Sequence, residues 1–175
     1  MLIDDTLFDE LAERAKQSER LRMNFNLHES AESKAQRLFN ALEPGTVLPI
    51  HRHRATAETF IILRGKLDVM FFNDQGEETE RHRLDVSRGH YGIQIPKGQW
   101  HSLEVVEPAV IFEVKDGPYR PLDPCDAMPS VPDWSIPSNI TFKERKSGRR
   151  RMEQKVFSGR TAISNMKIVS CVRFE

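Results

Sequence analysis

Three residues of types that bind metal ions in many proteins lie close together between positions 51 and 58. His51 and His53 are two residues apart, and Glu58 follows five residues later. Side chains at positions i and i+2 of a β-strand point to the same face, with about 7 Å between their Cα atoms, so both imidazoles can reach one ion. Glu58 opens the next strand-like run and offers a negatively charged ligand. This spacing predicts a metal site at the end of a strand.

A fourth candidate ligand, His101, follows a Pro96–Gly98 turn at the beginning of another strand-like run. Three imidazoles and one carboxylate suit a divalent transition metal (Mn, Fe, Co, Ni, Cu or Zn), whereas Ca²⁺ and Mg²⁺ prefer oxygen ligands throughout. The predicted cofactor is therefore one divalent transition metal ion, which the ligands do not identify further. The other histidines, His28, His82 and His90, have no histidine two residues away and are predicted not to be ligands.

The elements that must position these residues read mainly as β-strands. Short apolar runs between turn signals recur at roughly ten-residue intervals, which is typical of a sandwich or a closed barrel. The runs are QRLFNALEPG, TVLPIHRH, ETFIILRG, KLDVMFFNDQGE, RHRLDV, HYGIQIPKG, WHSLEVVE and AVIFEVKDG. Before them, residues 5–17 carry apolar residues at helical spacing, with Asp4, Asp5 or Thr6 as the N-cap. The sequence thus predicts one short N-terminal helix followed by an all-β domain.

Residues 22–28 alternate between apolar and polar side chains, as a half-buried strand does. The apolar face holds Met23, Phe25 and Leu27, and the polar face holds Arg22, Asn24, Asn26 and His28. Amides and a guanidinium can hydrogen-bond a hydroxyl-rich ligand such as a sugar. The polar face therefore either lines a substrate pocket or faces solvent, and both interpretations stay open.

Strand parity also suggests a pocket residue after Glu58. If Glu58 faces the interior of a barrel, Phe60, Ile62 and Arg64 face inward with it. The same rule sends Leu103 and Val105 inward with His101. Arg64 is then a candidate clamp for a carboxylate or phosphate, with an exposed arginine before a turn at Gly65 as the alternative.

The composition sets limits on domains and partners. The chain has 175 residues and a formal net charge of zero, which fits one domain without a global bias toward nucleic acid or membrane. Cys125 and Cys171 lack CxxC spacing, which argues against a disulfide scaffold. The first residues are acidic where a signal peptide is basic, and no run approaches eighteen apolar residues. We predict a soluble, cytoplasmic protein that does not bind membranes.

The end of the chain differs from the rest. Prolines recur from Pro118 to Pro137, and residues 131–175 contain ten Lys or Arg against four Asp or Glu, including the run KERKSGRRR. The predicted division is a helix in residues 1–20, a metal-binding barrel in 21–125 and a mobile extension in 126–175. No helix-turn-helix pattern accompanies the basic run, so we do not expect nucleic-acid binding.

Two spaced patterns resemble the motifs of the cupin superfamily. The first is Gly45-x5-His51-x-His53-x4-Glu58-x6-Gly65, and the second is Pro96-x-Gly98-x2-His101. The second departs from the usual form, because Gly89 lies one residue too early and Val105 stands where many cupins have Asn. The resemblance implies a cupin double-stranded β-helix, a jelly-roll barrel, with His51, His53, Glu58 and His101 as the metal ligands.

The order of motifs along residues 1–125 is similar to the WbuC family of cupin-fold metalloproteins. It comprises the N-terminal helix, RMNFNLH, AQRLFNALEPGT, PIHRH, FIILRGKL, IPKGQWHSLEV and FEVKDGPY. The resemblance implies a bacterial protein, an association with lipopolysaccharide O-antigen biosynthesis and a homodimer. It does not supply a reaction.

Two functions follow from these patterns. The first is an isomerase, decarboxylase or dioxygenase whose metal polarises an oxygen-rich small molecule, such as a sugar or nucleotide sugar. The second is a non-catalytic, metal-dependent module that binds or senses a small molecule. The sequence shows no acid or base beside the ligands, so metal binding is better supported than catalysis.

Overall fold

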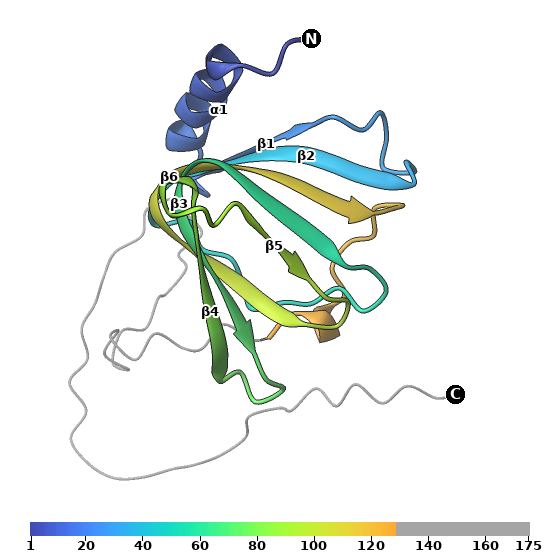
Figure 1. Ribbon diagram of the computed structural model, residues 1–175. Helices are drawn as coiled ribbons and strands as arrows, with labels where there is room; N and C mark the ends of the chain where they lie inside the picture. Colours follow the sequence, from blue (N-terminus) through green and yellow to red (C-terminus); the bar gives the residue numbers. More distant parts are fainter. Residues whose placement is uncertain (129–175) are drawn as a thin grey trace, which may run out of the picture. The chain divides into compact units, whose positions relative to one another are not determined.

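The fold is all-β with one short N-terminal α-helix, as the sequence predicts (Figure 1). The computed structural model describes residues 1–128; the basic run and most of the predicted extension lie outside this range. Helix α1 (Asp5–Gln17) has the predicted bounds, and Asp4 is its N-cap, accepting a hydrogen bond from the Leu7 amide at 3.1 Å. The strands are β1 (Arg22–Asn26), β2 (Ala35–Leu42), β3 (Glu58–Phe72), β4 (Glu78–Asp85), β5 (Gly92–Ile95) and β6 (Trp100–Asp116).

All six strands belong to one antiparallel sheet. Its order is β1-β2-β6-β3-β4, with β5 paired to the first residues of β3. The sheet curls, so that the strands surround an apolar interior (Figure 1). The buried residues of this interior are Leu42, Phe60, Ile62, Leu67, Val69, Phe71, Leu84, Ile95, Leu103, Val105, Ala109 and Ile111. Leu103 and Val105 are thus inward, as strand parity predicts.

A second apolar cluster joins α1 to the outer face of the sheet. Phe8, Leu11 and Ala15 of the helix are buried against Phe39 and Ala41 of β2. The Phe8 and Phe39 rings meet edge to face with their centroids 5.4 Å apart. Because successive strand residues alternate between faces, β2 packs odd-numbered residues on the helix and turns Leu38, Asn40 and Leu42 toward the inside.

Two strands are longer than the sequence suggests. The runs ETFIILRG and KLDVMFF form the single strand β3, and WHSLEVVE and AVIFEVKDG form the single strand β6. Gly65 is therefore a strand residue and does not form a turn. Its φ is +73°, and an added Cβ would lie 1.9 Å from the Pro108 carbonyl oxygen. The β3–β6 register shifts at this point, between Ile62 and Leu67, so the glycine lets both strands bend together.

Asp68 holds the outer face of β3 to β4. Its buried carboxylate accepts hydrogen bonds from Arg83 Nη2 at 3.0 Å and from Arg81 Nη1 at 3.2 Å, and it also contacts Arg83 Nε. The Arg83 hydrogen bonds outweigh burial and, with Arg81, lower the pKa of Asp68 below 3.8. A carboxylate with a depressed pKa contributes stability above its unfolded-state pKa and loses it as the pH falls through the folded-state value.

Replacing Asp68 with asparagine is expected to lower the free energy of unfolding by about 1–3 kcal/mol at pH 7, because two arginines lose their charged acceptor. The difference from wild type should shrink as the pH falls from 3.8 through the lower folded-state pKa of Asp68, because protonation then removes the charged acceptor from wild type as well. Urea unfolding at pH 7 and pH 3 measures both effects. Asp116→Asn is the matched control, since the exposed Asp116 side chain has no hydrogen bond or ion pair within residues 1–128. Equal losses for the two variants would contradict the role of Asp68.

Candidate metal centre

The four predicted ligands come from three separate parts of the fold. Glu58 begins β3 and His101 is the second residue of β6. His51 and His53 lie in the segment between β2 and β3, which is extended but is not one of the strands, contrary to the strand expected for TVLPIHRH. His51 nevertheless pairs with β6, donating to and accepting from the His101 backbone at 3.0 and 2.8 Å. This pairing places the two histidines side by side.

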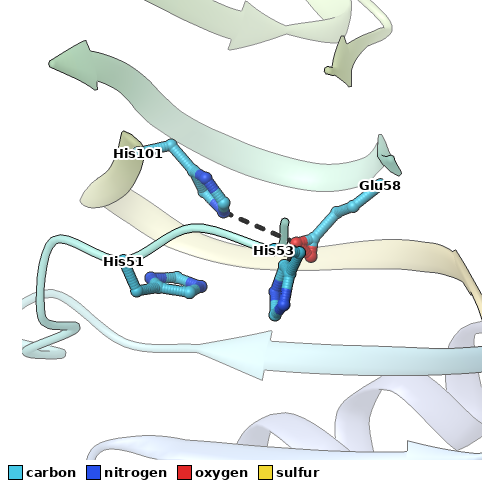
Figure 2. Close-up of side chains that lie close together, drawn as sticks. All are labelled: His51, His53, Glu58 and His101. Atoms are coloured by element: carbon cyan, nitrogen blue, oxygen red, sulfur yellow. Dashed lines mark ion pairs between the residues drawn. The ribbon is translucent and has the colours of Figure 1, made fainter. Parts of the chain in front are cut away.

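The side chains of all four residues point toward one another (Figure 2). One ligand atom from each lies within 4.8 Å of the ligand atoms of the other three. Glu58 Oε1 is 3.4 Å from His53 Nε2 and 3.5 Å from His101 Nε2. A set of four donors this close together can surround one ion, so the structure brings together the group predicted from spacing.

Backbone carbonyls orient two of the imidazoles. His51 Nδ1 lies 3.0 Å from the Pro49 oxygen, and His101 Nδ1 lies 2.9 Å from the Gln99 oxygen. A carbonyl only accepts, so Nδ1 carries the proton in both rings and Nε2 presents its lone pair to the centre. Burial, together with the neighbouring His101, lowers the pKa of His51 to about 4. His51 is therefore neutral at pH 7, as a metal ligand must be.

Two buried atoms of the site lack hydrogen-bond partners within residues 1–128. They are Glu58 Oε1 and His101 Nε2. Burial acts to raise the pKa of Glu58, but contacts with the His101 and His53 imidazoles and the Lys115 charge outweigh it, and the pKa is lowered. A buried carboxylate oxygen and a buried imidazole nitrogen aimed at one point are costly unless a cation satisfies them. The residues present therefore fit a divalent metal ion.

Residues just past β6 hold the histidine segment from its other side. The 3-10 helix η2 (Pro124–Asp126) is followed by Met128, whose amide donates to the Ile50 oxygen at 2.8 Å, while the Arg52 amide donates to the Asp126 oxygen at 2.9 Å. The Asp126 carboxylate also pairs with Arg52 Nε at 3.1 Å and with Arg54. We call residues 124–128 the strap. The strap packs on the metal site although it lies at the predicted end of the barrel.

A cavity of about 290 Å³ opens beside the metal ligands. His51, His53 and Glu58 contribute to its lining, and so do the predicted pocket residues Arg22 and Asn24. A second cavity of about 380 Å³ takes in Asn24 again and Asn26. The alternation of β1 explains this placement, because Met23, Phe25 and Leu27 pack toward α1 and leave the polar face to the cavities.

Arg64 is the predicted pocket residue that the structure places elsewhere. Its guanidinium donates to Asp9 Oδ1 at 2.6 Å, contacts Asp5 and lies 5.2 Å from the centre of the Phe8 ring. The cause is the irregular register of β3 around Arg64, which breaks the parity counted from Glu58. Arg64 therefore fastens α1 to the sheet and does not line either cavity.

Two ionisable residues near the ligands have no signal in the sequence motifs. Glu113 and Lys115 of β6 line both cavities. Lys115 Nζ is 3.4 Å from His53 Nε2, 3.8 Å from Glu58 Oε2 and 3.5 Å from Glu113 Oε1, and Asn40 Nδ2 donates to Glu113 Oε2 at 2.5 Å. Burial and the charge of Glu58 raise the pKa of Glu113 to about 7, against the opposing effect of Lys115. Their pairing with Phe60 and Glu58 of β3 brings them to the site, and this register cannot be counted from a single sequence.

The remaining histidines of the described chain have other partners. His28 Nδ1 lies 3.0 Å from the Arg37 oxygen, His90 Nδ1 lies 3.1 Å from the Arg83 oxygen, and His82 pairs with Glu80 at 2.9 Å. Trp100 is also used structurally, since its Nε1 donates to Asp74 at 2.9 Å. Within residues 1–128 the group of four is thus the one cluster of histidine, cysteine and acidic residues close enough to hold a metal ion.

One family model and several solved structures resemble parts of this chain. A family model described as a domain of unknown function, DUF6016, matches residues 3–84, which include His51, His53 and Glu58 but not His101. A comparison with curated proteins finds no match. Within residues 1–128 no helix combines the length and apolar character that crossing a bilayer requires.

Three solved structures similar to this chain come from bacteria. KdgF from Halomonas sp. is 15% identical, with 57% of this chain and 82% of that chain covered and a TM-score of 0.45. A cupin-2 domain protein from Shewanella frigidimarina is 21% identical, with coverages of 54% and 80% and a TM-score of 0.43. TT1209 from Thermus thermophilus is 19% identical, with coverages of 66% and 97% and a TM-score of 0.48. Likeness at this level carries no information on activity.

The class of protein follows from the chain's own fold and site. Its described part is an all-β domain with one short helix, in which three histidines and one glutamate form a group able to hold a metal ion.

Proposed function

We propose that this protein is a metal-dependent enzyme that moves a proton on a small, oxygen-rich molecule bound in the cavity beside His51, His53 and Glu58. The observation that carries the proposal is the position of Glu113 and Lys115, which line this cavity together with the metal ligands. A purely structural metal site is closed and needs no acid or base beside it.

Each group has a chemical role in this proposal. A bound divalent metal supplies Lewis-acid polarisation of a ligand oxygen. Glu113 accepts a proton from carbon and returns it, and burial suits it to both directions because it raises the pKa of its carboxyl toward neutral pH. Asn40 holds one oxygen of the Glu113 carboxylate, while Lys115 lies 3.5 Å from the other. The apolar part of the lining limits the access of water; it consists of Leu42, Leu48, Phe60, Leu103, Ile111 and Leu122.

Solvent deuterium exchange tests this role without knowledge of the net reaction. Cobalt-loaded protein in D₂O is mixed with hexoses, uronic acids and their phosphates, and NMR follows loss of the proton on carbon next to the carbonyl. We expect exchange with at least one probe and a rate about 100-fold or more lower for Glu113→Gln, with cobalt content unchanged. Glu107→Gln, on the exposed part of the same strand, is the control and should exchange at the wild-type rate.

The same experiment separates the two functions that the sequence leaves open. No exchange with any probe, in protein that retains cobalt, would favour the non-catalytic binding or sensor module. Exchange at the wild-type rate in Glu113→Gln would still support an enzyme, but it would show that Glu113 is not the group that moves the proton.

The sequence alone supports the proposed ligand class, biosynthetic role, oligomeric state and location of the protein. The motif order of residues 1–125 supports a WbuC-type protein, and with it a sugar or nucleotide-sugar ligand, a role in lipopolysaccharide O-antigen biosynthesis and a homodimer. A cytoplasmic location belongs to the same proposal, and its support is that the sequence has two cysteines, too few for a disulfide framework. Sedimentation at micromolar concentration tests the dimer directly.

A further inference from the structure

The cavity beside the metal ligands has a surplus of positive charge. Four cationic side chains line it: Arg20, Arg22, Lys115 and Arg120. The carboxylates in the same lining are Glu58 and Glu113, and Glu58 belongs to the metal site. A bound divalent ion would add two further positive charges. The cavity therefore favours a ligand that carries negative charge.

Three of these cations have no fixed partner in the described part of the chain. No side-chain hydrogen bond or ion pair within residues 1–128 holds the guanidinium of Arg20, Arg22 or Arg120. By contrast, Arg52 and Arg64 are each paired with a carboxylate. Arg22 is half-buried, and burial together with the charge of Arg20 lowers its pKa. A partly buried guanidinium that repels its neighbour is stabilised when an anion binds between them.

Guanidinium groups select among anions by shape. Their planar fork matches the oxygens of a carboxylate or a phosphate, which each accept two parallel hydrogen bonds. The neighbouring cavity shares Asn24, Glu113, Lys115 and Tyr119 with the first, so the two adjoin. Its further lining includes Asn26, Ser30 and Gln36, which are neutral hydrogen-bonding groups. A ligand with one anionic group and several hydroxyls matches the two cavities together.

We propose that the substrate is a hydroxyl-rich small molecule bearing an oxyanion, either a carboxylate or a phosphate, and that Arg22 and Arg120 bind this group. The proposal rests on the proposed function, since it names the substrate class of the same site. Arg22 is placed by the alternation of β1, and Arg120 comes from the segment after β6. In this proposal Arg22 and Arg120, from two separate chain segments, hydrogen-bond the oxyanion. Asn24 and Asn26 hydrogen-bond the hydroxyl groups.

Calorimetric titration of the full-length protein with three probes tests the substrate class. The probes are inorganic phosphate, glucuronate and glucose, added to cobalt-loaded and to metal-free protein. We expect phosphate or glucuronate to bind at least about tenfold more tightly than glucose, because each charged hydrogen bond outweighs a neutral one. Tighter phosphate binding identifies a phosphate ligand, and tighter glucuronate binding identifies a carboxylate ligand. Equal binding of all three probes, or of none, by protein that holds cobalt would overturn the proposal while leaving the metal site intact.

Variants then test the assignment to residues. Arg22→Gln is expected to weaken binding of the preferred anion at least about tenfold with cobalt affinity unchanged. Arg37→Gln removes the same charge from the neighbouring strand β2, outside both cavities, and should keep the wild-type affinity. Arg120→Gln gives a second measurement if Arg22→Gln does not fold. Wild-type affinity in both cavity variants would overturn the assignment. If wild-type protein does not bind cobalt, the proposed function is contradicted. The titration of metal-free protein with the three probes then tests the anion site independently of the metal.

Discussion

Replacing Glu58 with glutamine is expected to lower metal affinity by at least about 100-fold, since even residues that only orient metal ligands are worth 10–100-fold. The substitution keeps the size of the side chain but removes the negative charge that offsets the ion. Glu58 is 3% exposed, so water cannot replace its lost oxygen. Metal content of protein purified from cells, with a cobalt titration of the stripped protein, measures the effect.

The same prediction extends to stability. Metal that binds only the folded chain raises the free energy of unfolding by about 4 kcal/mol when the free ion is 1,000 times its Kd. Wild-type protein should therefore melt at a higher temperature with cobalt than with a chelator. Glu58→Gln and His101→Ala should show a much smaller difference, since a 100-fold weaker Kd leaves about 1.4 of the 4 kcal/mol at the same cobalt concentration. His82→Ala is the matched control, because His82 lies outside the group of four. Unchanged metal content in both ligand variants would refute the metal site.

Replacing Gly65 with alanine is expected to cost about 4 kcal/mol or more of folding free energy, or to prevent folding. The new Cβ would lie 1.9 Å from the Pro108 oxygen and 2.8 Å from the Ala109 Cα, and both contacts are with backbone of β6. The strands would have to separate at the point where both bend. Chemical unfolding monitored by circular dichroism measures the loss.

Gly89 provides a control that separates the clash from the backbone conformation. Its φ is +76°, close to that of Gly65, and an added Cβ there meets no atom within 4 Å. Gly89→Ala should therefore cost only the strain of a left-handed alanine, about 1–2 kcal/mol. If the two variants lose equal stability, the close approach of β3 and β6 is not what requires Gly65.

Local patterns in the sequence predict much of this structure. Helical spacing predicts α1, and alternation predicts both faces of β1. The spacing of His51, His53 and Glu58 predicts three of the four ligands, since these residues share a short segment whatever its exact conformation. In each of these cases the physical cause acts between residues close in the chain, so a single sequence contains it. His101, 43 residues after Glu58, is instead predicted from the second motif.

The features that the sequence does not predict depend on pairing between distant strands. The sequence predicts a turn at Gly65 because glycine often ends a strand. In the structure a glycine is needed there because the Pro108 backbone, 43 residues later, leaves no space for a side chain. Strand parity predicts that Arg64 faces inward. In the structure the register shift in β3 places its side chain against α1, where it pairs with Asp9. Glu113 and Lys115 carry no motif, and they reach the metal site only because β6 pairs with the beginning of β3. Such registers are tertiary properties.

The strap gives the metal centre an order of assembly. All four ligands lie between residues 51 and 101, but the segment with His51 and His53 is hydrogen-bonded on its open side by residues up to Met128. A growing chain therefore carries the complete donor set well before it carries the residues that hold two of those donors in place. We therefore expect the four residues to hold a metal ion stably only once the strap has been made and bonded to the histidine segment.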